Sequence, residues 1–218
     1  LGLVGSEMCI RDRFMTTQER IIEIKKQFRS MMNGVVSRSM REKGADYGII
    51  FGVEAPRLVG MAEEIGKNHD LAQALWKENV RECRILAMMI QPYDSFLSEI
   101  ADIWISSMRN QEEAQYASMY LFQYLPYAES KVFEWIADER DMYQLCGFLT
   151  VARLLLKGTQ FCPRTENELL DQCRSAIASE NKAVSKAAYN TLFKYSQQDE
   201  LHAKTVERIL KDCDRELL

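Results

Sequence analysis

The sequence predicts an all-α fold, a solenoid of stacked helical pairs, and three observations carry this prediction. One unit recurs between residues 70 and 195: a short apolar helix, a polar break and a second, longer apolar helix. Only 4 prolines and 10 glycines occur in 218 residues, which suits long helices joined by short turns. Tryptophan recurs at one place in successive units. Because a helix pair cannot bury its apolar side alone, such units must stack on their neighbours.

The units pair a first and a second helix over residues 71–76 and 80–90, 96–104 and 114–125, 132–136 and 142–156, and 169–177 and 183–195. Trp76, Trp104 and Trp135 lie near the ends of the first helices, and Ile177 takes that position in the last unit. Bulky aromatic side chains dominate helix–helix packing, so we expect the tryptophans in the core rather than on a stacking surface.

The segments that flank this array are also helical in pattern. Thr16 or Thr17 can cap a first helix that has Glu19 in its first turn, and a second helix ends at Lys43-Gly44. Residues 47–52 read as an extended connector, and Pro56 suits the first turn of the next helix. Residues 199–213 form a last, highly charged helix that is typical of a solenoid cap.

We expect a single domain over residues 14–218. Residues 1–13 (LGLVGSEMCIRDR) resemble an adapter-derived string that occurs in translations from environmental sequencing. The alternative interpretation is a short disordered tail. They are therefore left out of the functional interpretation, and Met15 is the expected start.

Composition excludes several classes of protein. Apolar residues make up 47% and charged residues 28%, the balance of a globular chain, and no apolar run is long enough to span a membrane. The 6 cysteines form no CxxC pair and only 2 histidines are present, so we expect no zinc site and no cofactor. We therefore expect the cysteine thiols to be reduced and the protein to be cytoplasmic. The formal net charge is −4, and the charged residues are unevenly distributed: the middle of the chain is acidic and the ends are nearly neutral or slightly basic.

Several short passages, in order along the chain, resemble one family. They are Phe51-Gly52-Val53 with Pro56-Arg57-Leu58 and Ala62-Glu63-Glu64-Ile65, then Leu75-Trp76 with Arg81-Glu82 and Leu86-Ala87, then Lys186-Ala187 with Leu192. Together they resemble the AlkD-like DNA alkylation repair proteins, which are built from HEAT-like helical pairs. The resemblance covers roughly residues 19–213. It implies a curved HEAT-like superhelix whose concave face holds duplex DNA.

The best-known members of that family are glycosylases for cationic alkylated purines. Loss of the charged base builds oxocarbenium character on the sugar, which a nearby carboxylate stabilises. Aromatic rings hold the cationic nucleotide, and an arginine holds the adjacent phosphate. By alignment the family's carboxylate falls on Gln115, its tryptophan on Gln111, its arginine on Leu145 and its second aromatic on Asn190. The resemblance therefore implies a family scaffold without the family's excision residues.

A displaced site is the alternative for an active enzyme. Glu112 precedes Gln115 by three residues, on nearly the same helix face, and Tyr116 can supply a ring beside it. The competing interpretation is that Glu112 and Glu113 are first-turn residues that complement the helix dipole.

The candidate phosphate contacts are basic residues on the second helices of the first and last units. They are Arg81, Arg84, Lys182, Lys186 and Lys194. The competing interpretation is a solvated surface with pairs inside one helix, such as Arg81 with Glu78.

The sequence thus predicts a family member that binds duplex DNA, with weak or absent base excision. The alternatives are a HEAT-repeat scaffold that binds a protein partner without catalysis, and an active glycosylase that uses Glu112.

Overall fold

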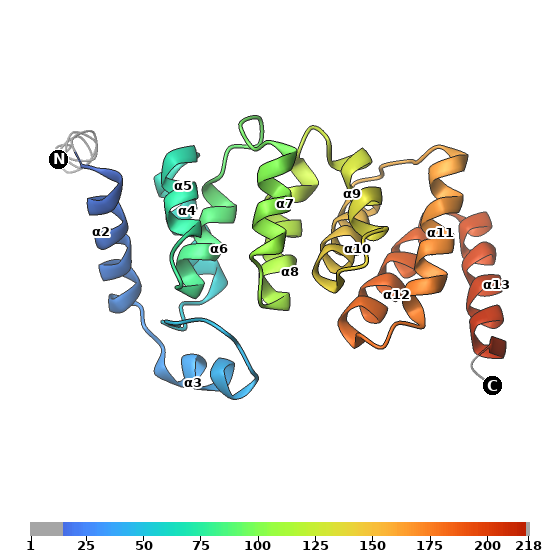
Figure 1. The fold of residues 1–218 in the computed structure, drawn as a ribbon, viewed down its shortest axis with the longest axis horizontal. Helices are drawn as coiled ribbons and strands as arrows, with labels where there is room; N and C mark the ends of the chain where they lie inside the picture. The colour runs from blue at the N-terminus through green and yellow to red at the C-terminus, as the bar shows by residue number, and fades with distance from the viewer. Residues whose placement is uncertain (1–14, 217–218) are drawn as a thin grey trace. The chain divides into compact units, whose positions relative to one another are not determined.

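The computed structural model describes residues 15–216, which are predominantly helical (Figure 1). Residues 1–13, which were left out of the functional interpretation, lie outside the described residues. The described chain divides into two compact units, one ending at Ser95 and the other beginning at Phe96. The expectation of one domain over residues 14–218 stays a prediction.

The first unit contains five helices among its described residues. They are α2 (Thr17–Ser30), α3 (Gly34–Glu42), α4 (Ala55–Ile65), α5 (His69–Trp76) and α6 (Arg81–Ile90). Helix α6 packs against α4 and α5, and α2 packs against α5. The predicted pair at residues 71–76 and 80–90 is confirmed by α5 and α6.

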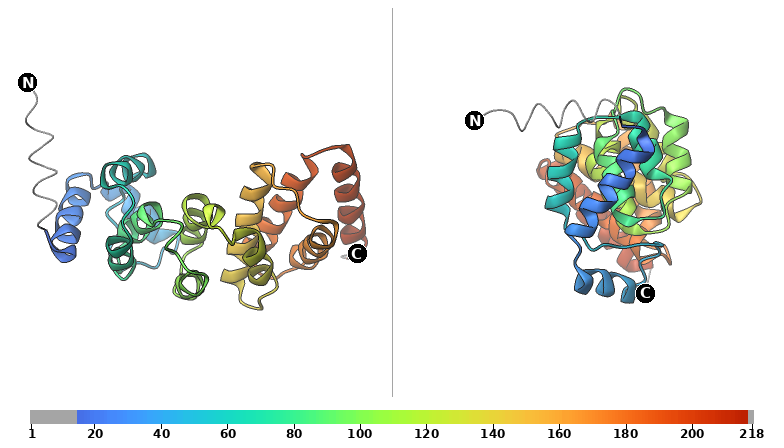
Figure 2. Two further views of the ribbon diagram at one scale, coloured as in Figure 1. Left: turned by 90° about the horizontal axis from the view of Figure 1, so that it is seen from above. Right: turned by 90° about the vertical axis from the view of Figure 1, so that its left-hand side faces the viewer.

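The second unit contains seven α-helices and one 3₁₀ turn among its described residues. They are α7 (Ser98–Ser106), α8 (Gln111–Tyr120), η1 (Phe122–Tyr124), α9 (Ala128–Ile136), α10 (Asp141–Leu156), α11 (Pro163–Ile177), α12 (Lys182–Ser196) and α13 (Glu200–Glu216). Helix α10 packs against α8, α9 and α12, while α13 lies beside α11 and α12 (Figures 1 and 2).

Several predicted boundaries differ from the structure, and two helices show this most clearly. The helix predicted over residues 114–125 begins at Gln111 and ends at Tyr120, after which η1 continues as a 3₁₀ turn. The helix predicted over residues 169–177 begins earlier, at Pro163. Proline is compatible with a first helical turn because the N–H it lacks has no partner there.

The start and stop signals lie where they were predicted. Thr16 caps α2 and exchanges hydrogen bonds with Glu19 as a capping box. Lys43 ends α3 and is followed by Gly44 with a φ of +87°. Trp76, Trp104 and Trp135 are all buried, as expected of core residues.

One buried ion pair fixes the connector between α3 and α4 against α6. The Glu82 carboxylate is fully buried and accepts hydrogen bonds from the backbone N–H groups of Phe51, Gly52 and Val53 at 3.1, 2.9 and 3.3 Å. The Arg81 guanidinium donates to Glu82 Oε1 and to the Val53 carbonyl, each at 3.1 Å. Two of the passages that indicated the family, Phe51-Gly52-Val53 and Arg81-Glu82, are therefore in direct contact.

Gly52 is required at this contact for two reasons. Its φ is +76°, a conformation that glycine adopts without strain. A Cβ atom at this position would also lie 2.4 Å from the Asn33 carbonyl oxygen. The close approach of the connector to the start of α3 therefore depends on glycine.

The Glu82→Gln substitution tests this anchor. It removes the negative charge beside the buried Arg81 guanidinium and turns an amide N–H₂ towards backbone donors, so we expect a loss of about 3–5 kcal/mol in the free energy of unfolding. Urea denaturation followed by circular dichroism measures this loss. Glu64→Gln, on the exposed surface of α4, is the matched control and should change stability by less than about 0.5 kcal/mol. Equal stability of the two variants would show that the anchor is dispensable.

Candidate nucleic-acid interface

Helix α12 is held in one orientation by its cap and by its buried side. The Asn181 side chain accepts hydrogen bonds from the Ala183 and Val184 N–H groups, which starts the helix. The Thr191 hydroxyl lies 3.0 Å from the Phe148 carbonyl oxygen of α10 and 2.9 Å from the Ala187 carbonyl oxygen. The buried side of the helix consists of Val184, Ala187, Ala188, Thr191, Leu192 and Tyr195.

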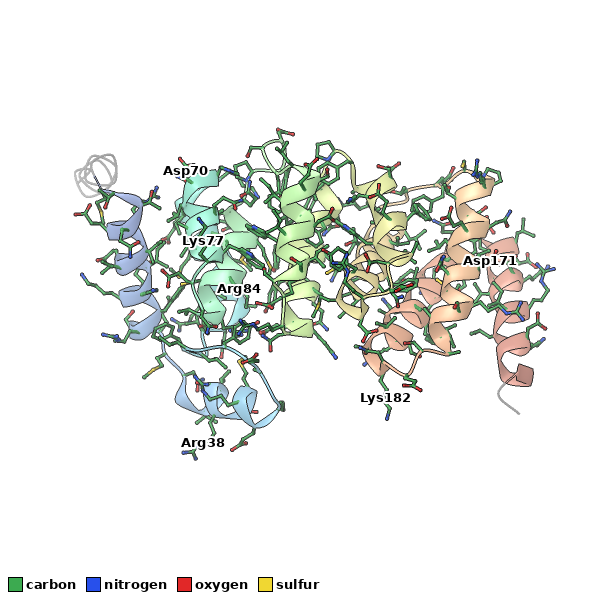
Figure 3. The ribbon with its side chains drawn as sticks, in the orientation of Figure 1. Arg38, Asp70, Lys77, Arg84, Asp171 and Lys182 are labelled. Atoms are coloured by element: carbon green, nitrogen blue, oxygen red, sulfur yellow. The ribbon has the colours of Figure 1, made fainter. Side chains whose placement is uncertain are left out.

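The opposite side of α12 is exposed and carries lysines and aromatic rings. Lys182, Lys186, Tyr189 and Phe193 follow one another at spacings of four, three and four residues, which places them on one helix face. All four are exposed, with 53% of Tyr189 and 49% of Phe193 accessible. Lys182 points away from the ribbon at the start of α12 (Figure 3). We call these four residues the α12 stripe.

The charge of α12 is entirely positive. Its sequence, KAVSKAAYNTLFKYS, contains three lysines and no acidic residue. Lys194 is half-buried, and its ammonium group lies 5.2 Å from the centre of the Phe193 ring and 3.4 Å from Gln197 Oε1. Of the predicted phosphate contacts, Lys182, Lys186 and Lys194 therefore lie together on one helix.

The structure corrects the interpretation of Arg81 as a phosphate contact. Its side chain is only 2% exposed and is committed to Val53 and Glu82. The expected pairing with Glu78 is also wrong, because the Glu78 carboxylate binds the Lys25 ammonium group at 2.7 Å. The sequence offered no sign that the start of α6 is buried beneath the connector.

Arg84 lies on the same helix but is held differently. Its guanidinium carbon lies 3.8 Å from the centre of the Trp76 ring, and the side chain is half-buried. A guanidinium group over an indole face contributes to the packing of α5 on α6. Its predicted role as a phosphate contact stays a prediction.

The two glutamates in the first turn of α8 have different environments. Glu113 is buried and accepts hydrogen bonds from the Arg109 and Asn110 N–H groups at 2.8 and 3.2 Å, which completes a capping box. Glu112 is half-buried, and the Tyr116 ring one turn later stacks on Tyr120 with centroids 5.9 Å apart. The interpretation of Glu113 as a structural first-turn residue agrees with this geometry, whereas the Glu112–Tyr116 site stays a prediction.

The positions aligned with the family's excision residues are spread over three helices of the second unit. Gln111 and Gln115 lie exposed, one turn apart, on α8, and Asn190 lies exposed on α12. Leu145 is buried within α10, with 6% of its surface accessible. None of these four side chains carries a charge or an aromatic ring.

Tyr189 and Phe193 were missed as functional candidates in the sequence. Their spacing from Lys182 and Lys186 was visible, but an aromatic residue in an apolar helix is usually assigned to the core. Ala187, Ala188 and Leu192 fill the buried side of α12 instead, which leaves both rings outside.

His202 connects α13 to α11 and to the loop before α13. Its Nε2 lies 3.1 Å from Glu166 Oε1 and its Nδ1 lies 2.6 Å from Asp199 Oδ1, while its ring packs edge-on against Tyr195. Burial alone would lower the pKa of His202, but the adjacent carboxylates of Asp199 and Glu166 outweigh it and raise the pKa. Among the described residues no group of three or more His, Cys, Asp or Glu side chains has the geometry of a metal site.

This cluster predicts a pH-dependent attachment of α13. A histidine whose folded-state pKa is raised stabilises the fold fully below its unfolded pKa of about 6.5, and this contribution is lost as pH rises through the folded-state value. The urea midpoint of the wild type should therefore exceed that of His202→Gln by more at pH 6 than at pH 9. A difference that stays constant between these pH values would contradict the pairing.

Fold and surface together define an all-helical repeat protein with one exposed basic and aromatic helix face. A family model described as "DNA alkylation repair enzyme" matches residues 24–210. The chain therefore belongs to the DNA alkylation repair family.

A solved structure supports the same fold. It is described as belonging to "a new family of proteins related to the HEAT-like repeat DNA glycosylases with affinity for branched DNA structures". The TM-score is 0.78 at 16% sequence identity, with 88% of this chain and 82% of that chain covered. The predicted HEAT-like helical fold is thus confirmed. No curated protein matches the sequence, and no helix within the described residues is long and apolar enough to cross a membrane.

Proposed function

We propose that this protein binds duplex DNA, and branched DNA in preference, through the exposed lysines of α12, with weak or absent base-excision activity. The observation that carries the proposal is the charge of α12: three lysines, two of them exposed, on a helix without an acidic residue. Lysines on an exposed face neutralise phosphates and release counterions, which is the main source of affinity for DNA.

Two further facts support the choice of ligand. The chain belongs to a DNA alkylation repair family, and a protein of similar fold is described as having affinity for branched DNA. A concave face formed along the whole array stays a prediction, and the proposal rests on α12 alone.

The proposal of weak or absent excision rests on the side chains at the aligned positions. An oxocarbenium-like transition state needs a nearby anion, whereas Gln111 and Gln115 present neutral amides on α8. Leu145 is buried and Asn190 has no ring, so neither can hold a phosphate or a cationic nucleotide in the way the family resemblance implies.

The first test measures binding of a three-way junction and of a duplex with the same sequence, at about 50 to 200 mM salt. We expect affinity to fall steeply with salt, and the Lys182→Ala/Lys186→Ala variant to reduce the slope of log K against log salt by about one to two. Lys204→Ala is the matched control, because Lys204 is an exposed lysine of α13 paired with Glu200. An unchanged slope in the double variant, or no binding by the wild type at about 50 mM salt, would overturn the proposal.

The second test asks whether methylated purines are released from alkylated duplex DNA. We expect release by the wild type at or near the uncatalysed rate, because no carboxylate stands at the aligned position. Release measured by chromatography that is abolished by Glu112→Gln would instead identify Glu112 as the carboxylate of a displaced site.

A further inference from the structure

The two rings of the α12 stripe have no role in the binding of phosphates. Tyr189 and Phe193 lie one turn apart and are each about half exposed, on a helix whose other side already fills the core. Beside them a hollow of about 210 Å³ opens between α12 and α13. Its lining is Tyr189, Leu192, Phe193, Ser196, Ala203, Val206, Glu207 and Leu210.

Positive charge surrounds these rings on their own helix. Lys186 precedes Tyr189 by three residues and Phe193 by seven, so it lies on the same face, and the Lys194 ammonium group lies 5.2 Å from the Phe193 ring centre. On the far wall of the hollow, Glu207 is the acidic residue in the lining. Rings interleaved with lysines are the arrangement with which proteins bind single-stranded nucleic acid, because bases stack on the rings while the cations follow the phosphates.

We propose that Tyr189 and Phe193 form a stacking platform for unpaired bases, and that the ligand of the α12 stripe is DNA with a single-stranded segment next to a duplex, as at the branch point of a junction. This inference rests on the proposed function and gives it a physical basis for selectivity. A fully paired duplex offers only phosphates to the lysines, whereas an open branch point also offers the faces of its unstacked bases.

The platform also explains why a helix of this charge retains apolar side chains on its surface. Stacking is tolerant of sequence, because every base has an aromatic face. The stripe is therefore expected to select DNA by structure and not by base sequence.

The test compares two three-way junctions, one fully paired and one with unpaired thymines at the branch point. In Tyr189→Leu/Phe193→Leu the apolar bulk is kept but the aromatic faces are lost. We expect this variant to bind the junction with unpaired thymines at least about fivefold more weakly than the wild type, since loss of one stacked base reduces affinity by about 5- to 150-fold. Its affinity for the fully paired junction and its salt slope should not change.

Three controls make the result specific. Tyr189→Phe/Phe193→Tyr keeps both rings and should bind as the wild type does. Tyr124→Ala removes a ring of similar exposure, 45%, outside α12 and should have no effect. A fluorescent base analogue at the unpaired position should be quenched by the wild type but not by the leucine variant.

The possible failures are distinguishable. If the wild type binds junctions and the leucine variant binds them equally well with the same quenching, the platform is wrong while the proposed function stands. If the wild type binds no DNA at about 50 mM salt, both are wrong. A third outcome is that neither the wild type nor the leucine variant binds DNA, while both bind a co-purifying helical protein equally well. This outcome would show instead that the stripe is an apolar docking face.

Discussion

The burial of one side of each second helix constrains everything else in this protein. A helix pair has too little apolar surface to form a core, so its second helix must be covered by neighbours along one side. In the second unit α10 packs against α8, α9 and α12 and is itself largely buried. The proposed function therefore rests on the side chains that a second helix carries on its outward face.

The second helices differ sharply in what those outward faces carry. Helix α8 presents Gln111 and Gln115 and contains two acidic residues and no basic one. Helix α12 presents lysines and rings and contains no acidic residue. Helix α6, from Arg81 to Ile90, is buried at every residue except Arg84, so its predicted phosphate contact Arg81 stabilises the fold instead. The proposed function, DNA binding with weak or absent base excision, is based on this distribution of side chains.

The sequence was sufficient to predict the helices and their pairing because these depend on local signals. The apolar spacing, Thr16 with Glu19, and Lys43 with Gly44 all act within a few residues. It was not sufficient to predict the site, because burial at a given helix position depends on segments distant in sequence. Arg81 is covered by a connector some 30 residues earlier in the chain, whereas Tyr189 and Phe193 are left outside because smaller residues fill the core behind α12.

Chemical footprinting of lysine amines tests the central claim most directly, because it reports where DNA lies on the full chain. The protein is treated with an amine-reactive reagent at low salt, with and without a three-way junction, and the modified lysines are identified by mass spectrometry. We predict that the junction protects Lys182 and Lys186 and leaves Lys204, on the neighbouring α13, fully reactive. Bound DNA that leaves Lys182 and Lys186 as reactive as in the free protein would contradict the account.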